Sequence, residues 1–84
     1  MQRHVVCNVA DYDIYLKQCA ALEKHIPGLV RIEELHDVDD SRIMIYQRNG
    51  LKLRVTNSFF DDGVYVESEF PLEPFFPKLR EQAV

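Results

Sequence analysis

The side chains best suited to bind a transition metal in this 84-residue chain are its histidines and cysteines: His4, Cys7, Cys19, His25 and His36. A zinc site needs three or four such ligands that converge on one point. Residues 4 and 7 of a strand point to opposite faces of a sheet, and residues 19 and 25 lie on different sides of a helix. We therefore predict that the chain binds no metal, and no other motif indicates a cofactor.

A second candidate for metal chemistry is the segment 37–41, which reads Asp-Val-Asp-Asp-Ser and resembles the opening of a calcium-binding loop. Such a loop needs a glycine at its sixth position and a glutamate that closes it. Arg42 stands at the glycine position, and no glutamate follows at the required spacing. The segment is therefore predicted to be a solvated acidic turn.

Catalytic motifs are missing from the sequence. No Gly-x-Ser-x-Gly nucleophile motif is present, and Cys19 falls on the apolar stripe of a predicted helix, where a thiol usually serves packing. The three glycines, Gly28, Gly50 and Gly63, are all needed for a helix stop and two turns, so none is left for a phosphate-binding loop. We expect that the protein is not an enzyme.

The elements that position these residues are set by two turn signals, Asn49-Gly50 and Asp62-Gly63. Both dipeptides favour two-residue hairpins, so they predict a three-stranded antiparallel meander from about Arg42 to Phe70. The first turn places Met44 opposite Val55, and the second places Val55 opposite Phe70. The two registers agree on one apolar face, made of Met44, Tyr46, Leu51, Leu53, Val55, Phe59, Val64, Val66 and Phe70.

The remaining segments predict one strand before a helix and another after it. Residues 3–9 favour the first strand, and residues 29–35 favour the second, with Val30 and Ile32 on one face. Between them a helix begins at Asp11 or Asp13 and ends at Pro27-Gly28. Its apolar stripe consists of Tyr15, Cys19, Leu22 and Ile26.

Residues 1–84 are therefore expected to form a single α+β domain, with one helix packed on a four- to five-stranded antiparallel sheet. Pro74 can begin a short C-terminal helix. That helix would carry Phe75, Phe76, Leu79 and Ala83. The β-α-β-β-β-β order resembles that of cystatin- and monellin-like folds. The likeness is architectural only, because residues 47–50 (Gln-Arg-Asn-Gly) do not match the Gln-x-Val-x-Gly inhibitory loop of cystatins.

Charge and composition narrow the kind of partner. The formal net charge of −4 argues against nucleic acid and against an anionic membrane surface. No stretch approaches the roughly 20 apolar residues of a membrane span, and no signal-peptide core follows Met1, so we expect a cytoplasmic protein. Cys7 and Cys19 are predicted to be reduced thiols, although they could meet across the core.

Two surfaces could bind another protein. The first is an acidic segment that could dock a basic protein surface, with solubility and edge protection as its alternative role. It consists of Glu33, Glu34, Asp37, Asp39 and Asp40. The second is the outer sheet face, where Ile43, Ile45, Phe60 and Tyr65 are predicted to cluster within a ring of charges that includes Arg54. The alternative for this face is that the C-terminal segment covers it.

These observations predict a small non-catalytic protein-interaction module, such as an inhibitor or immunity-type protein that occludes its partner. Two other functions remain open. The chain could assemble into a homo-oligomer through its outer sheet face. It could also bind a small ligand in the cleft between helix and sheet.

Overall fold

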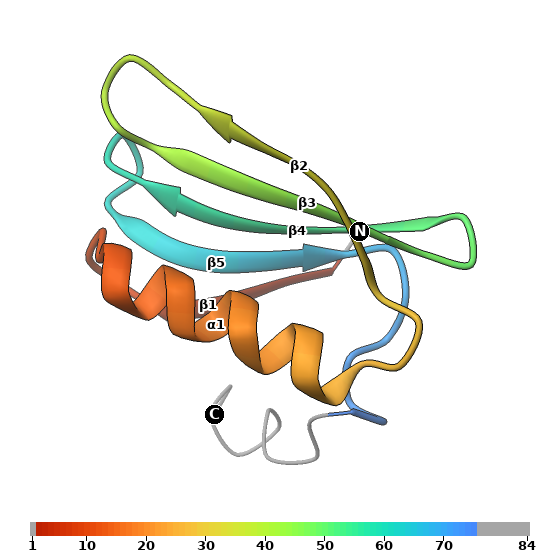
Figure 1. The fold of residues 1–84 in the computed structure, drawn as a ribbon. Helices are drawn as coiled ribbons and strands as arrows, with labels where there is room; N and C mark the ends of the chain where they lie inside the picture. The colour runs from red at the N-terminus through yellow and green to blue at the C-terminus, as the bar shows by residue number, and fades with distance from the viewer. Residues whose placement is uncertain (1, 76–84) are drawn as a thin grey trace.

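The computed structural model of this chain describes residues 2–75 and places one helix on one face of a five-stranded antiparallel sheet (Figure 1). In chain order the elements are β1 (Gln2–Cys7), α1 (Tyr12–His25), β2 (Val30–His36), β3 (Arg42–Arg48), β4 (Leu51–Ser58) and β5 (Gly63–Ser68). The strand order is β1-β5-β4-β3-β2, so β1 and β2 form the two edges. The predicted α+β class and element order are confirmed.

The helix begins and packs as its sequence predicts. Asp11 is the N-cap residue, and its carboxylate accepts a hydrogen bond of 3.0 Å from the backbone N–H of Ile14. The predicted apolar stripe is buried throughout: Tyr15, Cys19, Leu22 and Ile26. Figure 1 shows α1 lying across one face of the sheet, and its backbone approaches β4 more closely than the other strands.

The first hairpin forms in the predicted register. Met44 pairs with Val55 and Arg48 pairs with Leu51. Asn49 and Gly50 have φ angles of 51° and 79°. A two-residue turn of this kind needs positive φ at both central residues, which is why Asn-Gly forms it readily.

The predicted register of the second hairpin is wrong by four residues. Val55 pairs with Val66 rather than with Phe70, because the turn is a four-residue loop over residues 59–62. Within this loop Asp62 has a positive φ of 52°, while Gly63 is already part of β5. A Cβ atom at Gly63 would lie 3.0 Å from the backbone oxygen of Cys7. This glycine is therefore needed for the close approach of β1, and not for a turn.

An even shift of register keeps each side chain on its predicted face, so most of the core prediction survives. Seven of the nine predicted meander residues are buried: Met44, Tyr46, Leu53, Val55, Val64, Val66 and Phe70. Leu51 and Phe59 are wrong, since both are exposed. Phe59 lies in the loop that replaced the predicted strand end. Leu72 is also buried in the core, which the sequence did not predict.

The edge strand β2 departs from simple alternation. Its pairing with β3 shifts between Arg31 and Glu33, so Ile32 is an extra, bulged residue. Val30 and Ile32 therefore do not alternate on one face as predicted. Every residue of β2 is exposed, and Arg31 and Glu34 lie opposite the buried residues Tyr46 and Met44. The edge strand thus presents charged side chains on the helix side of the sheet.

Residues 73–75 form a turn after the sheet, and the rest of the predicted C-terminal helix, including Phe76, Leu79 and Ala83, lies outside the described residues. Phe75 packs against the core, with its ring centroid 6.4 Å from that of Phe70. It therefore does not cover the outer sheet face. Within residues 2–75 no helix is long and apolar enough to cross a membrane.

Candidate protein-interaction surface

Cross-strand pairing arranges the outer sheet face into an apolar row and a charged row. Successive partners in the apolar row are Leu35, Ile43, Thr56, Tyr65 and Val5. Successive partners in the charged row are Glu33, Ile45, Arg54, Glu67 and Arg3. Glu67 accepts ion pairs from both arginines, at 3.3 Å from Arg54 and 3.4 Å from Arg3. Glu67 thus joins the two arginines of the charged row.

Four residues of the apolar row, Leu35, Ile43, Thr56 and Tyr65, line a hollow of about 480 Å³ beside two loops, which we call the loop-end hollow. It lies where the β2–β3 loop (37–41) and the β4–β5 loop (59–62) meet, at the left end of the sheet in Figure 1. The lining residues are Leu35, His36, Asp37, Asp39, Ser41, Ile43, Thr56, Ser58, Phe60 and Tyr65. The two surfaces predicted from sequence therefore meet in one place.

Hydrogen bonds between backbone and side chain fix the β2–β3 loop. The carboxylate of Asp37 accepts from the N–H of Val38 at 2.7 Å, and the carboxylate of Asp39 accepts from the N–H of Ser41 at 3.0 Å. The Ser41 hydroxyl in turn accepts from the N–H of Phe59 at 2.9 Å and so joins the two loops. These bonds hold the acidic side chains in place before any partner arrives.

The third loop at this end, residues 8–11, is held by buried and turn residues of the sheet. The side-chain oxygen of Asn57 accepts from the N–H of Asp11 at 2.9 Å, and Asn57 is only 1% exposed. Asp62 accepts from the N–H of Ala10 at 3.0 Å. The loop end is thus preorganised from three separate segments of the chain.

Large apolar side chains project from this end into solvent. Phe60 is 90% exposed, Val38 is fully exposed, and Phe59 is about half exposed. Phenylalanine buries a large apolar area when it enters a pocket, so an aromatic ring on a fixed loop is suited to act as an anchor. These exposed apolar side chains therefore do not contribute to packing of the protein's own core.

The charge at this end is strongly negative. The two loops that border the hollow, 37–41 and 59–62, carry five aspartates: Asp37, Asp39, Asp40, Asp61 and Asp62. The hydrogen bonds from the backbone and hydroxyl of Ser41 hold the pKa of Asp39 below its usual value, so this group is ionised at neutral pH. His36 lies 3.0 Å from Asp40. A partner that meets this end therefore faces acidic groups around an apolar row.

The ten residues predicted to bind a partner fall into four groups. Five of them line the loop-end hollow: Asp37, Asp39, Ile43, Phe60 and Tyr65. Asp40 belongs to the same loop and pairs with His36, while Glu33, Ile45 and Arg54 lie one row away in the charged row. Glu34 is on the opposite, helix-facing side of the sheet.

Sequence reasoning missed several residues of the hollow, namely Leu35, His36, Ser41, Thr56 and Ser58. Leu35, Ile43 and Thr56 share a cross-strand row, so a correct register for β2 would have placed Leu35 there. The serines carry no such signal, because their roles depend on how the two loops meet.

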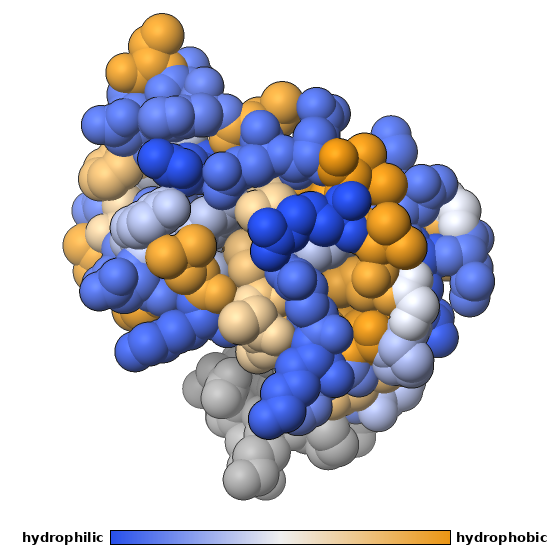
Figure 2. Space-filling model, viewed as in Figure 1, coloured by the Kyte–Doolittle hydropathy of each residue, from blue (hydrophilic) through white to orange (hydrophobic). Residues whose placement is uncertain are grey.

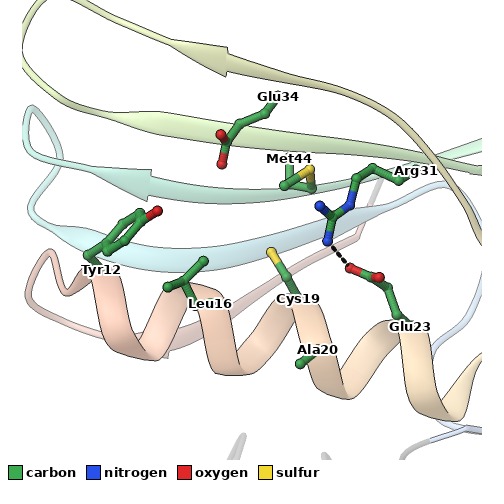
Figure 3. A pocket seen from close by; sticks show the side chains of 8 residues that line it. All are labelled: Tyr12, Leu16, Cys19, Ala20, Glu23, Arg31, Glu34 and Met44. Carbon is green, nitrogen blue, oxygen red and sulfur yellow. Dashed lines mark hydrogen bonds and ion pairs between the residues drawn. The ribbon is translucent and has the colours of Figure 1, made fainter.

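A second hollow, of about 280 Å³, lies between α1 and the edge strand β2 (Figure 3). It is lined by Tyr12, Leu16, Cys19, Ala20, Glu23, Arg31, Glu34 and Met44. In the view of Figure 1, Figure 2 shows moderately hydrophobic surface beside α1, bordered by hydrophilic side chains. This is the cleft between helix and sheet in which the sequence allowed a small ligand.

The polar groups of this second hollow are already paired with one another. Glu23 accepts from Arg31 and from the Tyr46 hydroxyl, each at 2.5 Å, and Figure 3 shows Arg31 reaching down from β2 toward Glu23. Glu34 accepts from the Tyr15 hydroxyl at 2.7 Å and from Arg42 at 3.4 Å. Each carboxylate is thus held by one tyrosine and one arginine.

These contacts set the protonation states in the second hollow. Burial alone would raise the pKa of Glu23, but the hydrogen bonds from Tyr46 and Arg31 outweigh it and lower that pKa. Burial raises the pKa of the Cys19 thiol, which disfavours the reactive thiolate. The network therefore ties the helix to the edge strand.

The chain matches no protein-family model, and no curated protein or solved structure is significantly similar to it. The functional interpretation therefore rests on the geometry of the chain itself. On that basis the loop-end hollow is the stronger candidate site, because exposed apolar side chains and acidic side chains lie together there.

Proposed function

We propose that this protein is a non-catalytic interaction module that binds a partner protein with a basic surface through the loop-end hollow. The observation that carries the proposal is the position of Phe60. This ring is 90% exposed, lines the loop-end hollow and belongs to one of two loops that together carry five aspartates. An exposed aromatic anchor with charged surroundings has the composition of a protein interface.

The two kinds of side chain would contribute to different steps of binding. Burial of a phenylalanine ring in a partner pocket stabilises a complex by about 1.5–3 kcal/mol. The aspartates would speed encounter with a positively charged partner and fix its orientation. Because exposed charges are screened within about 8 Å at physiological salt, the association should weaken as ionic strength rises.

Occlusion of the partner is the mode of action we propose, as in a small inhibitor or immunity-type protein. The rigid loops support this, because a preorganised surface loses little conformational entropy on binding. We also propose that binding occurs in the cytoplasm, on the support of the two free cysteines, Cys7 and Cys19.

The experiment that tests the proposal compares capture of proteins by immobilised wild-type and variant chains. Phe60→Ala removes the anchor, and the double variant Asp37→Asn/Asp39→Asn removes two charges while keeping oxygens that can accept the loop hydrogen bonds. The matched control is Glu69→Gln/Glu73→Gln, which changes the net charge equally but lies outside the hollow.

We expect one protein with a basic surface to be retained by the wild type and the control, and at least tenfold less by both site variants. That loss corresponds to about 1.4 kcal/mol or more. Equal capture by all four chains, or loss with the control alone, would contradict the proposal.

A further inference from the structure

The edge strand β2 offers a second surface, independent of the aromatic anchor. All seven of its residues are exposed, and it pairs with β3 on one side only. Its large apolar side chains are open to solvent, with Val30 57% exposed and Leu35 45% exposed. The backbone groups on the free side of an edge strand can pair with another strand.

The bulge at Ile32 gives this edge an unusual pattern of faces. Residues three apart in a regular strand point to opposite faces. In β2, however, Arg31 and Glu34 lie opposite Tyr46 and Met44, which share one face. Val30 and Leu35 likewise share the other face, because the bulged residue restores the alternation between them.

This pattern is complementary to itself in an antiparallel pairing. With the bulged Ile32 left out of the pairing, a two-fold axis perpendicular to the sheet at Glu33 places Val30 of one copy opposite Leu35 of the second copy, and Arg31 opposite Glu34. Each contact then occurs twice, once on either side of the axis. We propose that β2 pairs with β2 of a second copy in this register, so that two sheets join into one.

Neighbouring registers lack this complementarity. A shift of two positions in one direction places Arg31 opposite Arg31, and a shift in the other direction places Glu34 opposite Glu34. Like charges directly opposite each other on neighbouring strands are destabilising. In the proposed register, Glu33 faces Glu33 of the second copy at the axis. This single like-charged pair is set against four favourable contacts, two between Val30 and Leu35 and two between Arg31 and Glu34.

The charged residues are able to make the additional contact. Arg31 donates from one nitrogen to Glu23, and its guanidinium has further N–H donors. Its side chain is 53% exposed and that of Glu34 is 31% exposed. Leu35 also lines the loop-end hollow, so pairing would add Val30 of the second copy beside its wall.

The test is the solution mass of the intact chain by size-exclusion chromatography with light scattering, from about 10 μM to 1 mM. We expect the wild type to shift from the monomer mass of 9.9 kDa toward twice that value as concentration rises. Val30→Glu should reduce the dimer fraction, because it places a carboxylate opposite Leu35 and near Glu33. Val30→Glu/Leu35→Lys should restore it, because each glutamate then faces a lysine.

Two further variants keep the test specific. Val5→Glu changes an apolar residue of the opposite edge strand that is 63% exposed, and it should leave the dimer unchanged. Glu33→Gln should tighten the dimer by removing the repulsion at the axis. Circular dichroism confirms that each variant is folded. A wild type that stays monomeric up to 1 mM, or a dimer that Val30→Glu leaves intact, would overturn the proposal.

Discussion

At the scale of single residues, the loop end is held together by a few polar groups removed from solvent. Asn57 is the clearest of these, since its side-chain oxygen accepts a hydrogen bond from Asp11 while the residue is 1% exposed. A buried donor that loses its partner costs about 1–3 kcal/mol. The sequence did not mark Asn57 as special, because an asparagine at a strand end is ordinary until the neighbouring loop is placed.

Replacement of Asn57 by alanine tests this role. The variant should lower the free energy of unfolding by about 1–3 kcal/mol, as measured by urea denaturation, because the N–H of Asp11 is left unpaired. Asn8→Ala is the control, since Asn8 is exposed in the same loop end. If both variants unfold at the wild-type midpoint, Asn57 does not hold the loop.

The buried tyrosines of the second hollow predict how stability depends on pH. Burial, followed by the hydrogen bond to a glutamate, raises the pKa of Tyr15 and of Tyr46 well above the usual value. Since a tyrosine of the unfolded chain ionises near pH 10, stability from these groups is complete below that pH. Above it, the free energy of unfolding falls by up to about 1.4 kcal/mol per pH unit for each tyrosine.

The measurement is the urea midpoint of the wild type and of Tyr15→Phe/Tyr46→Phe at pH 8 and at pH 11. The variant starts less stable, because each glutamate loses a hydrogen bond, but it should lose less stability between the two pH values. Parallel losses in the two proteins would show that these hydroxyls ionise as readily in the folded state as in the unfolded chain.

At the scale of elements, the two hairpins show what turn chemistry can predict. Asn49-Gly50 sets both the turn and the register, because both residues adopt positive φ and nothing else constrains them. Asp62-Gly63 carries the same signal, yet its glycine serves the contact with Cys7 on β1. Local sequence thus predicts the Asn49-Gly50 turn, where the glycine is required by the turn itself. The prediction fails at Asp62-Gly63, where the glycine is required by contact with a strand distant in sequence.

Gly50→Ala is the matching test for the first hairpin. Nothing lies within 4 Å of the added Cβ, so the cost comes only from the φ of 79°. We expect a loss of about 1–2 kcal/mol in the free energy of unfolding. Asn49→Gly should change it far less, because glycine accepts positive φ readily. A stable Gly50→Ala variant would mean that the turn has relaxed to another type.

The β2 strand shows a second limit of sequence analysis. A bulge has no reliable sequence signal, so the alternation of Val30 and Ile32 predicted a shared face that the structure does not have. The faces of β3 and β4 were predicted correctly, because their buried sides are long and uninterrupted. The acidic loop was recognised from its composition, but its position beside Phe60 depended on the arrangement of the strands.

At the scale of the whole molecule, the surfaces differ in how far their charged groups are paired within the chain. On the helix side of β2, Arg31 and Glu34 pair within the chain, and on the outer face Glu67 pairs with Arg3 and Arg54. The loop end exposes Phe60 and Val38 beside the aspartates of its loops, of which Asp40 pairs with His36. This difference is why we assign partner binding to the loop end and not to the second hollow.

The most direct test of that assignment is the comparative capture experiment repeated at two salt concentrations. The wild type should retain a basic partner at 0.05 M salt and release much of it at 0.5 M, whereas Asp37→Asn/Asp39→Asn should bind more weakly and depend less on salt. Phe60→Ala should lose affinity at both concentrations while its salt dependence stays the same. A captured partner that binds Phe60→Ala as tightly as the wild type would contradict the account.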